Sequence, residues 1–293
     1  MGTYIVFGLV SGVIYGLVAL GIVLVYKGTR VFNFAQGEFG TVAMYILFWL
    51  HEMQSVNYAL AALVAIMTAV AMGLVTERLV VRPLSSAPKV IALVGTAGVA
   101  LMAIGIQFVI AKPQPRGVSP AFRGAGLSLF GFIVSKQDFL ALGMLIVIAA
   151  GAALFFQRTY LGMGILANSQ DSVATRIVGA NANRISLLTW GIAGLLGGIA
   201  GVLLAPNATL VPGFMTTGLL ITAFAAAVLG GMTSLVGAFV AGAIIGLIEA
   251  IGNFIISRNP ALEVVPDATI PLVFVVLILT LLVRPQGLFG SEA

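Results

Sequence analysis

The chain contains no cysteine and only one histidine. Without cysteine, disulfide bonds and thiolate metal sites are excluded, and cysteine usage leaves the redox compartment undetermined. His51 alone cannot form an all-histidine metal site, and neither a G-x-x-x-x-G-K-[ST] phosphate loop nor an H-E-x-x-H zinc motif occurs. We therefore expect no metal site, no cofactor and no catalysis in this chain. Any ATP that it uses must be bound by another chain.

Charge is also scarce. Only 8% of the 293 residues are charged, whereas 60% are hydrophobic and the mean hydropathy is +1.16. This composition is too apolar for a water-soluble core and predicts an integral membrane protein. Thirty-six glycines against 11 prolines favour closely packed helices over a β-barrel. The net charge of +5 is more typical of loops that orient a membrane protein than of nucleic-acid binding.

The chain has nine apolar segments, which make nine crossings of a hydrocarbon core of roughly 30 Å if the short second and seventh segments each traverse it. They are Thr3–Tyr26, Phe39–Leu50, Tyr58–Thr76, Val90–Ala111, Phe139–Phe156, Ile185–Ala205, Leu219–Gly230, Leu235–Ile256 and Ala268–Val283. The predicted fold is all-α: one transmembrane domain over residues 1–293, a polytopic helical bundle of about 8–10 spans with short or broken segments. Phe39–Leu50 is either a tilted helix completed by the polar residues before it or a re-entrant segment.

Lys27 and Arg30 follow the first segment directly, which predicts an external N-terminus. An odd number of crossings then makes the C-terminus cytoplasmic. Nine basic residues would be cytoplasmic (Lys27, Arg30, Arg78, Arg82, Lys89, Arg158, Arg176, Arg184 and Arg284) and five external (Lys112, Arg116, Arg123, Lys136 and Arg258). The external loop Lys112–Asp138 is either a docking surface for an acidic partner or an ordinary solvated loop.

Glu38 and Glu249 lie in or beside apolar segments, where a carboxylate costs about 2.5–3.5 kcal/mol and must face protein or water. For Glu249 we favour helix packing, and for Glu38 packing and a transport pathway are equally consistent. The candidates for a translocation path are Asn33, Gln36, Glu38 and Glu249. Small residues at helical spacing predict close helix packing at Gly8, Gly12, Gly16, Gly230, Gly231, Gly242 and Gly246.

The longest polar interval with helix signals is residues 158–184. Leu166, Val173 and Ile177 fall on one helical stripe. Asp171 suits the first turn of a second short helix, and Gly179 suits its left-handed end. This insert is either an interfacial helix on the lipid headgroups or a surface presented to a partner.

Three separated segments resemble the permease subunits of branched-chain amino-acid ABC transporters, the LivH/LivM family. The first is Gly16-Leu-Val-Ala-Leu-Gly21 with Asn33-Phe-Ala-Gln-Gly-Glu38, and the second is Arg158-Thr-Tyr-Leu-Gly162 with Asp171–Gly179. The third joins Ala223-Phe-Ala-Ala-Ala-Val-Leu-Gly-Gly231, Ser234, Gly237-Ala238 and Arg284-Pro-Gln-Gly-Leu-Phe-Gly290. Together they span nearly the whole chain in the expected order.

The resemblance implies a pore-forming importer subunit for branched-chain or related small amino acids or amides, in a bacterial or archaeal plasma membrane. It also implies four kinds of partner: two cytoplasmic ABC ATPases, a homologous second permease, an external solute-binding protein and membrane lipid. The insert then becomes the region that couples to the ATPases, with Gly162, Leu166, Ala167, Asp171, Ala174, Ile177 and Gly179 as coupling residues.

An autonomous channel or an ion-coupled carrier is the alternative. Ion coupling usually needs ionisable or broken-helix sites near the middle of the membrane, for which Glu38 and Glu249 are the available carboxylates. A channel needs no folded insert, whereas an importer permease explains one. A membrane scaffold without transport explains neither the insert nor the glycine-rich segments.

Overall fold

A computed structural model describes residues 2–112, 114–122, 126–129, 132–170, 181–258 and 269–290. The long helices of this part of the chain are α1 (Gly2–Thr29), α3 (Tyr58–Thr76), α4 (Lys89–Ala111), α5 (Lys136–Arg158), α8 (Ala182–Leu204) and α10 (Leu235–Ile256). The shorter helices are α2 (Gln36–Phe48), α6 (Tyr160–Gln170), α9 (Leu220–Gly230) and α11 (Thr269–Val283). Single turns precede or extend them: η1 (Trp49–Met53), η2 (Glu77–Val81), η3 (Ala205–Asn207) and η4 (Met215–Leu219).

Helices α3 and α10 begin at a capping side chain. Asn57 accepts a hydrogen bond from the Ala59 amide at the start of α3, and Ser234 accepts one from Gly237 at the start of α10, each at 2.9 Å. These side chains replace the intrahelical acceptors that first-turn amides lack. At the end of α9, Gly231 has φ +93°, a conformation that a residue without Cβ adopts at little cost.

Helix α1 is the centre of the bundle and packs against α10, α8 and α9. In its apolar span 83% of the residues are buried, compared with 28% in α3 and in α4. Residues Leu17, Val18 and Ala19 have no exposed surface. All three helices are apolar all round, so hydropathy alone does not separate them. Helix α1 has protein on most sides, whereas α3 and α4 keep apolar surface that matches lipid.

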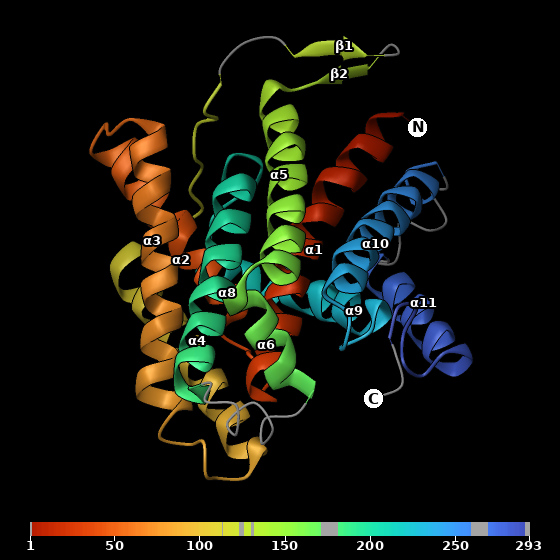
Figure 1. Ribbon diagram of the computed structural model, residues 1–293. Coiled ribbons are helices and arrows are strands. Elements are labelled where there is room, and N and C mark those ends of the chain that lie inside the picture. The colour runs from red at the N-terminus through yellow and green to blue at the C-terminus, as the bar shows by residue number, and fades with distance from the viewer. Residues whose placement is uncertain are drawn as a thin grey trace.

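The molecule has two ends that can be followed in Figure 1. A short antiparallel hairpin, β1 (Leu127–Leu129) paired with β2 (Phe132–Val134), lies at one end, near the start of α1. Helix α6 lies toward the other end, near the end of α1. We call these the hairpin end and the α6 end.

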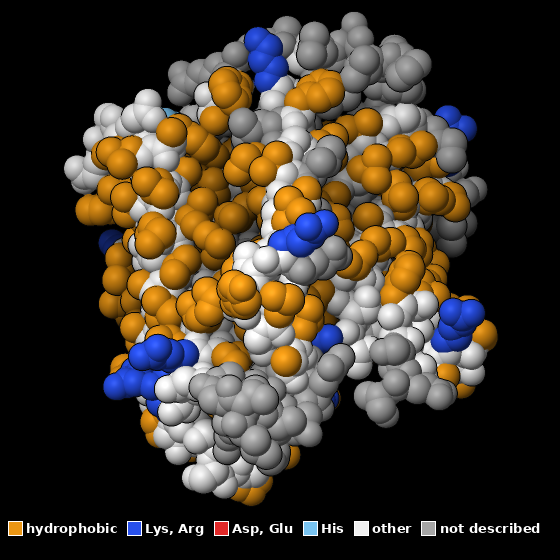
Figure 2. Space-filling model, viewed as in Figure 1, with side chains coloured by type: hydrophobic (Ala, Val, Ile, Leu, Met, Phe, Trp, Pro, Cys, Tyr) orange, Lys and Arg blue, Asp and Glu red, His pale blue; other side chains and the backbone are white. Residues whose placement is uncertain are grey.

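The predicted all-α bundle is confirmed, with the small hairpin as an addition within the loop Lys112–Asp138. Five helices of the described residues are long and apolar enough to cross a membrane, and Met215–Gly230 and Pro271–Val283 are shorter apolar helices. Figure 2 shows hydrophobic side chains over most of the described surface on one face, and no acidic side chain of those residues is visible there. Such a surface matches a hydrocarbon environment.

Candidate functional site: the junction of two half-length helices

Helix α2 begins inside the bundle. Its first residue, Gln36, has no exposed surface, and its side-chain amide donates a 2.9 Å hydrogen bond to the carbonyl of Ala193 in α8. Asn33 closes the turn before it: its amide donates to Gln36 Oε1 at 3.0 Å, and its own Oδ1 accepts from the Ala35 amide at 3.0 Å. Side chains thus replace the backbone partners that an interrupted chain lacks in a lipid bilayer.

The contact between Gly21 of α1 and Gln36 shows how deep in the bundle α2 begins. A Cβ atom added at Gly21 would lie 2.5 Å from Gln36 Nε2, so the two residues touch. Eight residues of helix separate Gly21 from Thr29, which corresponds to about 12 Å at 1.5 Å per residue. Segment Phe39–Leu50 therefore starts in the bundle interior. It belongs to α2, a half-length helix of 13 residues against 28 in α1, which η1 continues toward the hairpin end.

The second half-length helix, formed by η4 and α9, starts against the first. A Cβ at Gly37 would lie 2.5 Å from Thr216 Oγ1, and the amide of Met215 donates to Thr41 Oγ1 at 3.1 Å. The α2 and α9 starts thus meet in the interior while the helices run to opposite ends. Because each helix N-terminus carries partial positive charge, their meeting point favours a negative group.

Glu38 supplies a negative group, in the first turn of α2, and it has no exposed surface. Gln107 of α4 donates to Glu38 Oε2 through Nε2, and its own Oε1 accepts a 2.9 Å bond from the Gly213 amide. One glutamine thus joins α2, α4 and the turn before α9. Glu38 Oε1 and Thr216 Oγ1 are buried without a hydrogen-bond partner among the described residues, so the junction retains polar capacity.

A cavity of about 610 Å³ opens between α2, η1 and α4, with Gln107 on its wall. Its remaining lining is mainly apolar: Val42, Tyr45, Ile46, Phe48, Trp49, Met53, Met72, Met102, Ala103, Ile106, Ile110, Ala111 and Arg116. The volume lies in the range of small-molecule sites. The junction and the cavity therefore meet at one side chain, that of Gln107.

Glu249 lies elsewhere, between α10 and the first half of α1. It lines a separate cavity of about 280 Å³ with Tyr4, Gly8, Ser11 and Asn253 among its neighbours. Its Oε2 atom is buried without a hydrogen-bond partner among the described residues. The structure thus brings together Asn33, Gln36 and Glu38 but not Glu249.

The predicted glycine ridges form the interface between α1 and α10. A Cβ atom would lie 2.7 Å from Gly246 O at Gly8, 2.8 Å from Gly242 O at Gly12 and 2.7 Å from Phe239 O at Gly16. The two backbones approach too closely for any larger residue. Near the α6 end, Gly231 contacts the terminal segment: a Cβ there would meet Gln286 O at 2.9 Å.

At the α6 end, Gly162 lets α6 fold back onto the end of α5. Its amide donates to Thr159 Oγ1 at 3.0 Å, and a Cβ there would lie 2.6 Å from Phe156 Cα. Leu166 packs on an apolar cluster that joins α1, α5, α6 and α8 (Leu24, Phe156, Ile165 and Ile185), and Ala167 is exposed. Asp171, Ala174, Ile177 and Gly179 lie outside the described residues.

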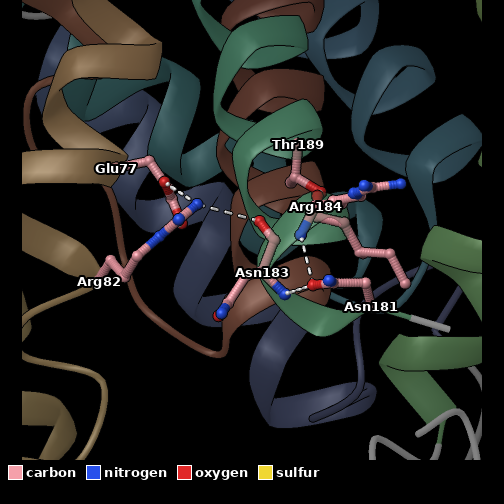
Figure 3. A network of polar contacts seen from close by, with 7 residues as sticks. Glu77, Arg82, Asn181, Asn183, Arg184 and Thr189 are labelled. Carbon is pink, nitrogen blue, oxygen red and sulfur yellow. Dashed lines mark hydrogen bonds and ion pairs between the residues drawn. The ribbon is translucent and has the colours of Figure 1, made fainter.

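The next described residue along the chain is Asn181, whose side chain caps the start of α8 (Figure 3). Asn181 Oδ1 accepts from the amides of Asn183 at 3.0 Å and Arg184 at 3.2 Å. Arg82, after η2, donates to the carbonyl of Asn183 at 3.2 Å and pairs with Glu77 at 2.8 Å. The Glu77 side chain is 1% exposed, and its ion pair holds the Arg82 guanidinium in place. The hydrogen bond from Arg82 to Asn183 then ties the start of α8 to the end of η2.

The site includes residues that the sequence patterns did not single out, mainly Gln107 and Thr41 at the junction and Arg116 in the cavity. Gln107 interrupts the apolar run of α4, and that interruption is the one signal that could have found it. Thr41 is a common residue in helices, and Arg116 stands in a loop rich in basic residues. Their roles depend on contacts with distant segments.

The comparison with protein families decides the class of the protein. The family model for the branched-chain amino acid transport system permease component matches residues 4–283. The chain belongs to this family. It is similar to the branched-chain amino acid permease protein BraD of Pseudomonas aeruginosa, with 32% identity over 97% of this chain and 94% of the relative. It is also similar to LivH of Escherichia coli, with 30% identity over 97% of this chain and 93% of the relative.

A weaker similarity extends to a sugar transporter. The ribose import permease protein RbsC of Escherichia coli is 28% identical over 62% of this chain and 55% of its own length. Among solved structures, PsaBC from Streptococcus pneumoniae in complex with Fab has a TM-score of 0.51 and covers 96% of this chain and 91% of its own. At 12% identity this likeness shows the fold alone. The family member described here is therefore a membrane permease component.

Proposed function

We propose that this permease component carries branched-chain or related small aliphatic amino acids across the plasma membrane as part of an ATP-driven importer. The match to the family model over residues 4–283 carries the proposal. The junction of α2 and α9 supports it, because half-length helices meeting inside a bundle commonly build substrate sites in transporters. The channel or ion-coupled carrier is the second candidate, and it shares the buried Glu38.

We infer that two ATPases, a second homologous permease and a solute-binding protein complete the importer. The chain offers no phosphate-binding loop, so the energy of ATP must reach it from outside. With the N-terminus external, the hairpin end faces the solute-binding protein and the α6 end faces the ATPases. The excess of basic residues in the cytoplasmic loops supports this orientation.

The insert, residues 158–184, is then the coupling element. Its described part packs directly against the bundle, because Ile165 and Leu166 contact the same apolar cluster as Leu24 of the central helix α1. Asn181 and Arg82 tie its far end to α8 and α3. A rigid-body shift of the insert would therefore reach the helices that carry the junction.

Substitution of the insert tests this proposal in reconstituted importers. We expect Asp171→Lys with Ala174→Trp to uncouple ATP hydrolysis from leucine uptake while membrane insertion stays intact, since a bulky, charge-reversed surface no longer fits the ATPase. Arg78→Glu is the matched control, because it reverses an exposed charge at the same end without touching the insert. ATP-dependent uptake of radiolabelled leucine and ATP hydrolysis are measured together.

The outcomes separate the two candidate functions. Loss of uptake in the insert variant alone supports the importer and its coupling element. Normal uptake in that variant contradicts the coupling assignment. Leucine flux in liposomes that contain this chain without any ATPase contradicts the importer and favours the channel or carrier.

A further inference from the structure

The cavity between α2, η1 and α4 has charge at one end and hydrogen-bonding capacity at the other. Arg116 stands where the chain leaves α4, and its guanidinium donates to the carbonyl of Ala111 at 3.0 Å and lies over the Phe48 ring at 5.1 Å. Gln107 lies about one helical turn before Ala111 in α4, and its side-chain amide donates a hydrogen bond to Glu38. The wall between them is aliphatic, with Ile106 and Ile110 from α4.

Arg116 has no anionic partner in the part of the chain that the structure describes, where the one ion pair is that of Arg82 with Glu77. Its Nε atom is buried and makes no hydrogen bond to a described residue. Beyond the Ala111 carbonyl and the Phe48 ring, the half-buried guanidinium has further donors that an anion entering the cavity could satisfy. Its backbone is fixed in place by paired hydrogen bonds with Leu210 at 2.8 and 3.1 Å.

Tyr45 adds a second unsatisfied group on the same wall. Its hydroxyl is buried without a hydrogen-bond partner among the residues described. A hydroxyl and a guanidinium in one cavity are the donors that a carboxylate accepts from. At the inner end, Gln107 Oε1 has a second lone pair, and the Glu38 carboxyl group that Gln107 binds lies next to it, outside the cavity lining.

We propose that this cavity is a binding site for the zwitterion of an aliphatic amino acid: Arg116 and Tyr45 bind the carboxylate, the Gln107–Glu38 end accepts from the ammonium group, and the aliphatic wall holds the side chain. The proposal rests on the function proposed above and deepens it. Four residues separate Ala111 from Gln107, so the two ends lie about one helical turn, roughly 6 Å, apart along α4. An α-amino acid with a hydrogen bond at each end bridges such a gap.

The polar inner end distinguishes this occupant from an anionic phospholipid. A lipid headgroup would satisfy Arg116, but its acyl chain would lie against Gln107 and leave the second lone pair of Gln107 Oε1 without a donor. A zwitterion satisfies both ends at once, and its side chain meets the apolar wall.

The absence of cysteine allows a direct test in the complete transporter, purified in lipid nanodiscs without added solute-binding protein. Ile106→Cys places the subunit's single thiol on the cavity wall, and we call this group the wall thiol. Val109→Cys places the thiol on the same helix outside the cavity, where Val109 is 81% exposed.

N-ethylmaleimide labelling of this subunit is followed by mass spectrometry. With leucine at about ten times its Kd, we expect labelling of the wall thiol to slow about tenfold, because only the empty cavity reacts.

Three further measurements assign the groups. Leucinamide lacks the carboxylate and should protect the wall thiol at about tenfold higher concentration than leucine, as should leucine in the Arg116→Gln variant, because each loses a charge-assisted hydrogen bond. Tyr45→Phe, which removes one hydroxyl, should weaken protection by a smaller factor. The control Arg258→Gln removes an arginine that stacks on Phe254 at 4.6 Å outside the cavity, and protection should be unchanged.

Protection of the wall thiol that depends on Arg116 supports the proposal. A labelling rate of the wall thiol that leucine leaves unchanged, in a transporter that takes up leucine, overturns it and leaves the proposed function intact. A labelling rate that follows the phosphatidylglycerol content of the nanodisc and ignores leucine also overturns it, in favour of a lipid site. Failure of the wild-type transporter to take up any aliphatic amino acid counts against the proposed function itself.

Discussion

Two interfaces of this permease use different means to hold helices together. Between α1 and α10, glycines on both helices bring backbone against backbone, as where a Cβ at Gly12 would lie 2.8 Å from Gly242 O. Between α2, α4 and α9, side chains such as Glu38, Gln107 and Thr41 make the contacts, and a cavity of about 610 Å³ lies beside them. Lipid gives no hydrophobic drive for helix association, so close packing and hydrogen bonds are the two available means.

The difference has a functional consequence. A glycine interface leaves no space and has one arrangement, so it suits a part of the molecule that moves as a unit. A hydrogen-bonded junction with buried unsatisfied atoms has more than one possible arrangement of partners, and it suits the part that receives a substrate. We expect substitutions in the first interface to affect folding and those in the second to affect transport.

The largest effect should come from breaking the glycine interface. Gly242→Leu places a branched side chain where even a Cβ atom would lie 2.8 Å from Gly12 O, and we expect at least about 3 kcal/mol of destabilisation and little folded protein. Gly105→Ala is the control, because a Cβ at Gly105 meets nothing within 4 Å among the described atoms. Fluorescence-detected size-exclusion chromatography after a heat series measures both. A monodisperse, heat-stable Gly242→Leu protein would show that the two backbones separate easily.

An intermediate effect is expected at the junction. Glu38→Gln retains an acceptor for Gln107 but removes the charge, so the melting temperature should stay near that of the wild type while uptake falls about tenfold or more. Glu38→Ala leaves the Gln107 amide without its acceptor and should also cost about 1–3 kcal/mol of stability. Paired measurements of leucine uptake and thermal stability separate the two losses. Normal uptake in Glu38→Gln would remove the carboxylate from the transport site.

The smallest effect is expected from the removal of a single hydrogen bond within the junction. Thr41→Val keeps the shape of the side chain but removes the oxygen that accepts from the Met215 amide, at a cost of about 1 kcal/mol. We expect a melting temperature a few degrees lower and uptake that is reduced but measurable. Thr68→Val is the control, because the Thr68 hydroxyl donates only to the Val64 carbonyl of its own helix and is exposed. Equal shifts in the two variants would mean that the bond to Met215 adds nothing.

The sequence predicted the helices well because a bilayer imposes length and polarity on each span. The predicted segments Tyr58–Thr76 and Leu235–Ile256 coincide with α3 and α10. For the short segment Phe39–Leu50 the sequence allows either a tilted or a re-entrant helix, since apolar length alone does not say where a helix starts. Its start at Gln36 depends on the Ala193 carbonyl of α8, which is 157 positions away in sequence.

The candidate site was only partly predictable for the same reason. Asn33, Gln36 and Glu38 are close in sequence and conspicuous as polar residues beside an apolar run, so local reading found them. The roles of Gln107 and Arg116 depend on their contacts with α2. The hydrogen bond from Gln107 to Glu38 joins residues 69 positions apart in the sequence. Nothing in the local pattern of α4 specifies that partner.

The sequence by itself determined that this protein is a multi-span helical membrane protein, where its apolar helices lie and which family it belongs to. These properties follow from hydropathy, from glycine spacing and from motifs, all of which are local along the chain. The tertiary structure alone decided that two half-length helices start against each other and that Gln107 joins them beside a cavity. Those contacts exist only where distant segments meet, and in the membrane interior each polar group must find its partner within the protein.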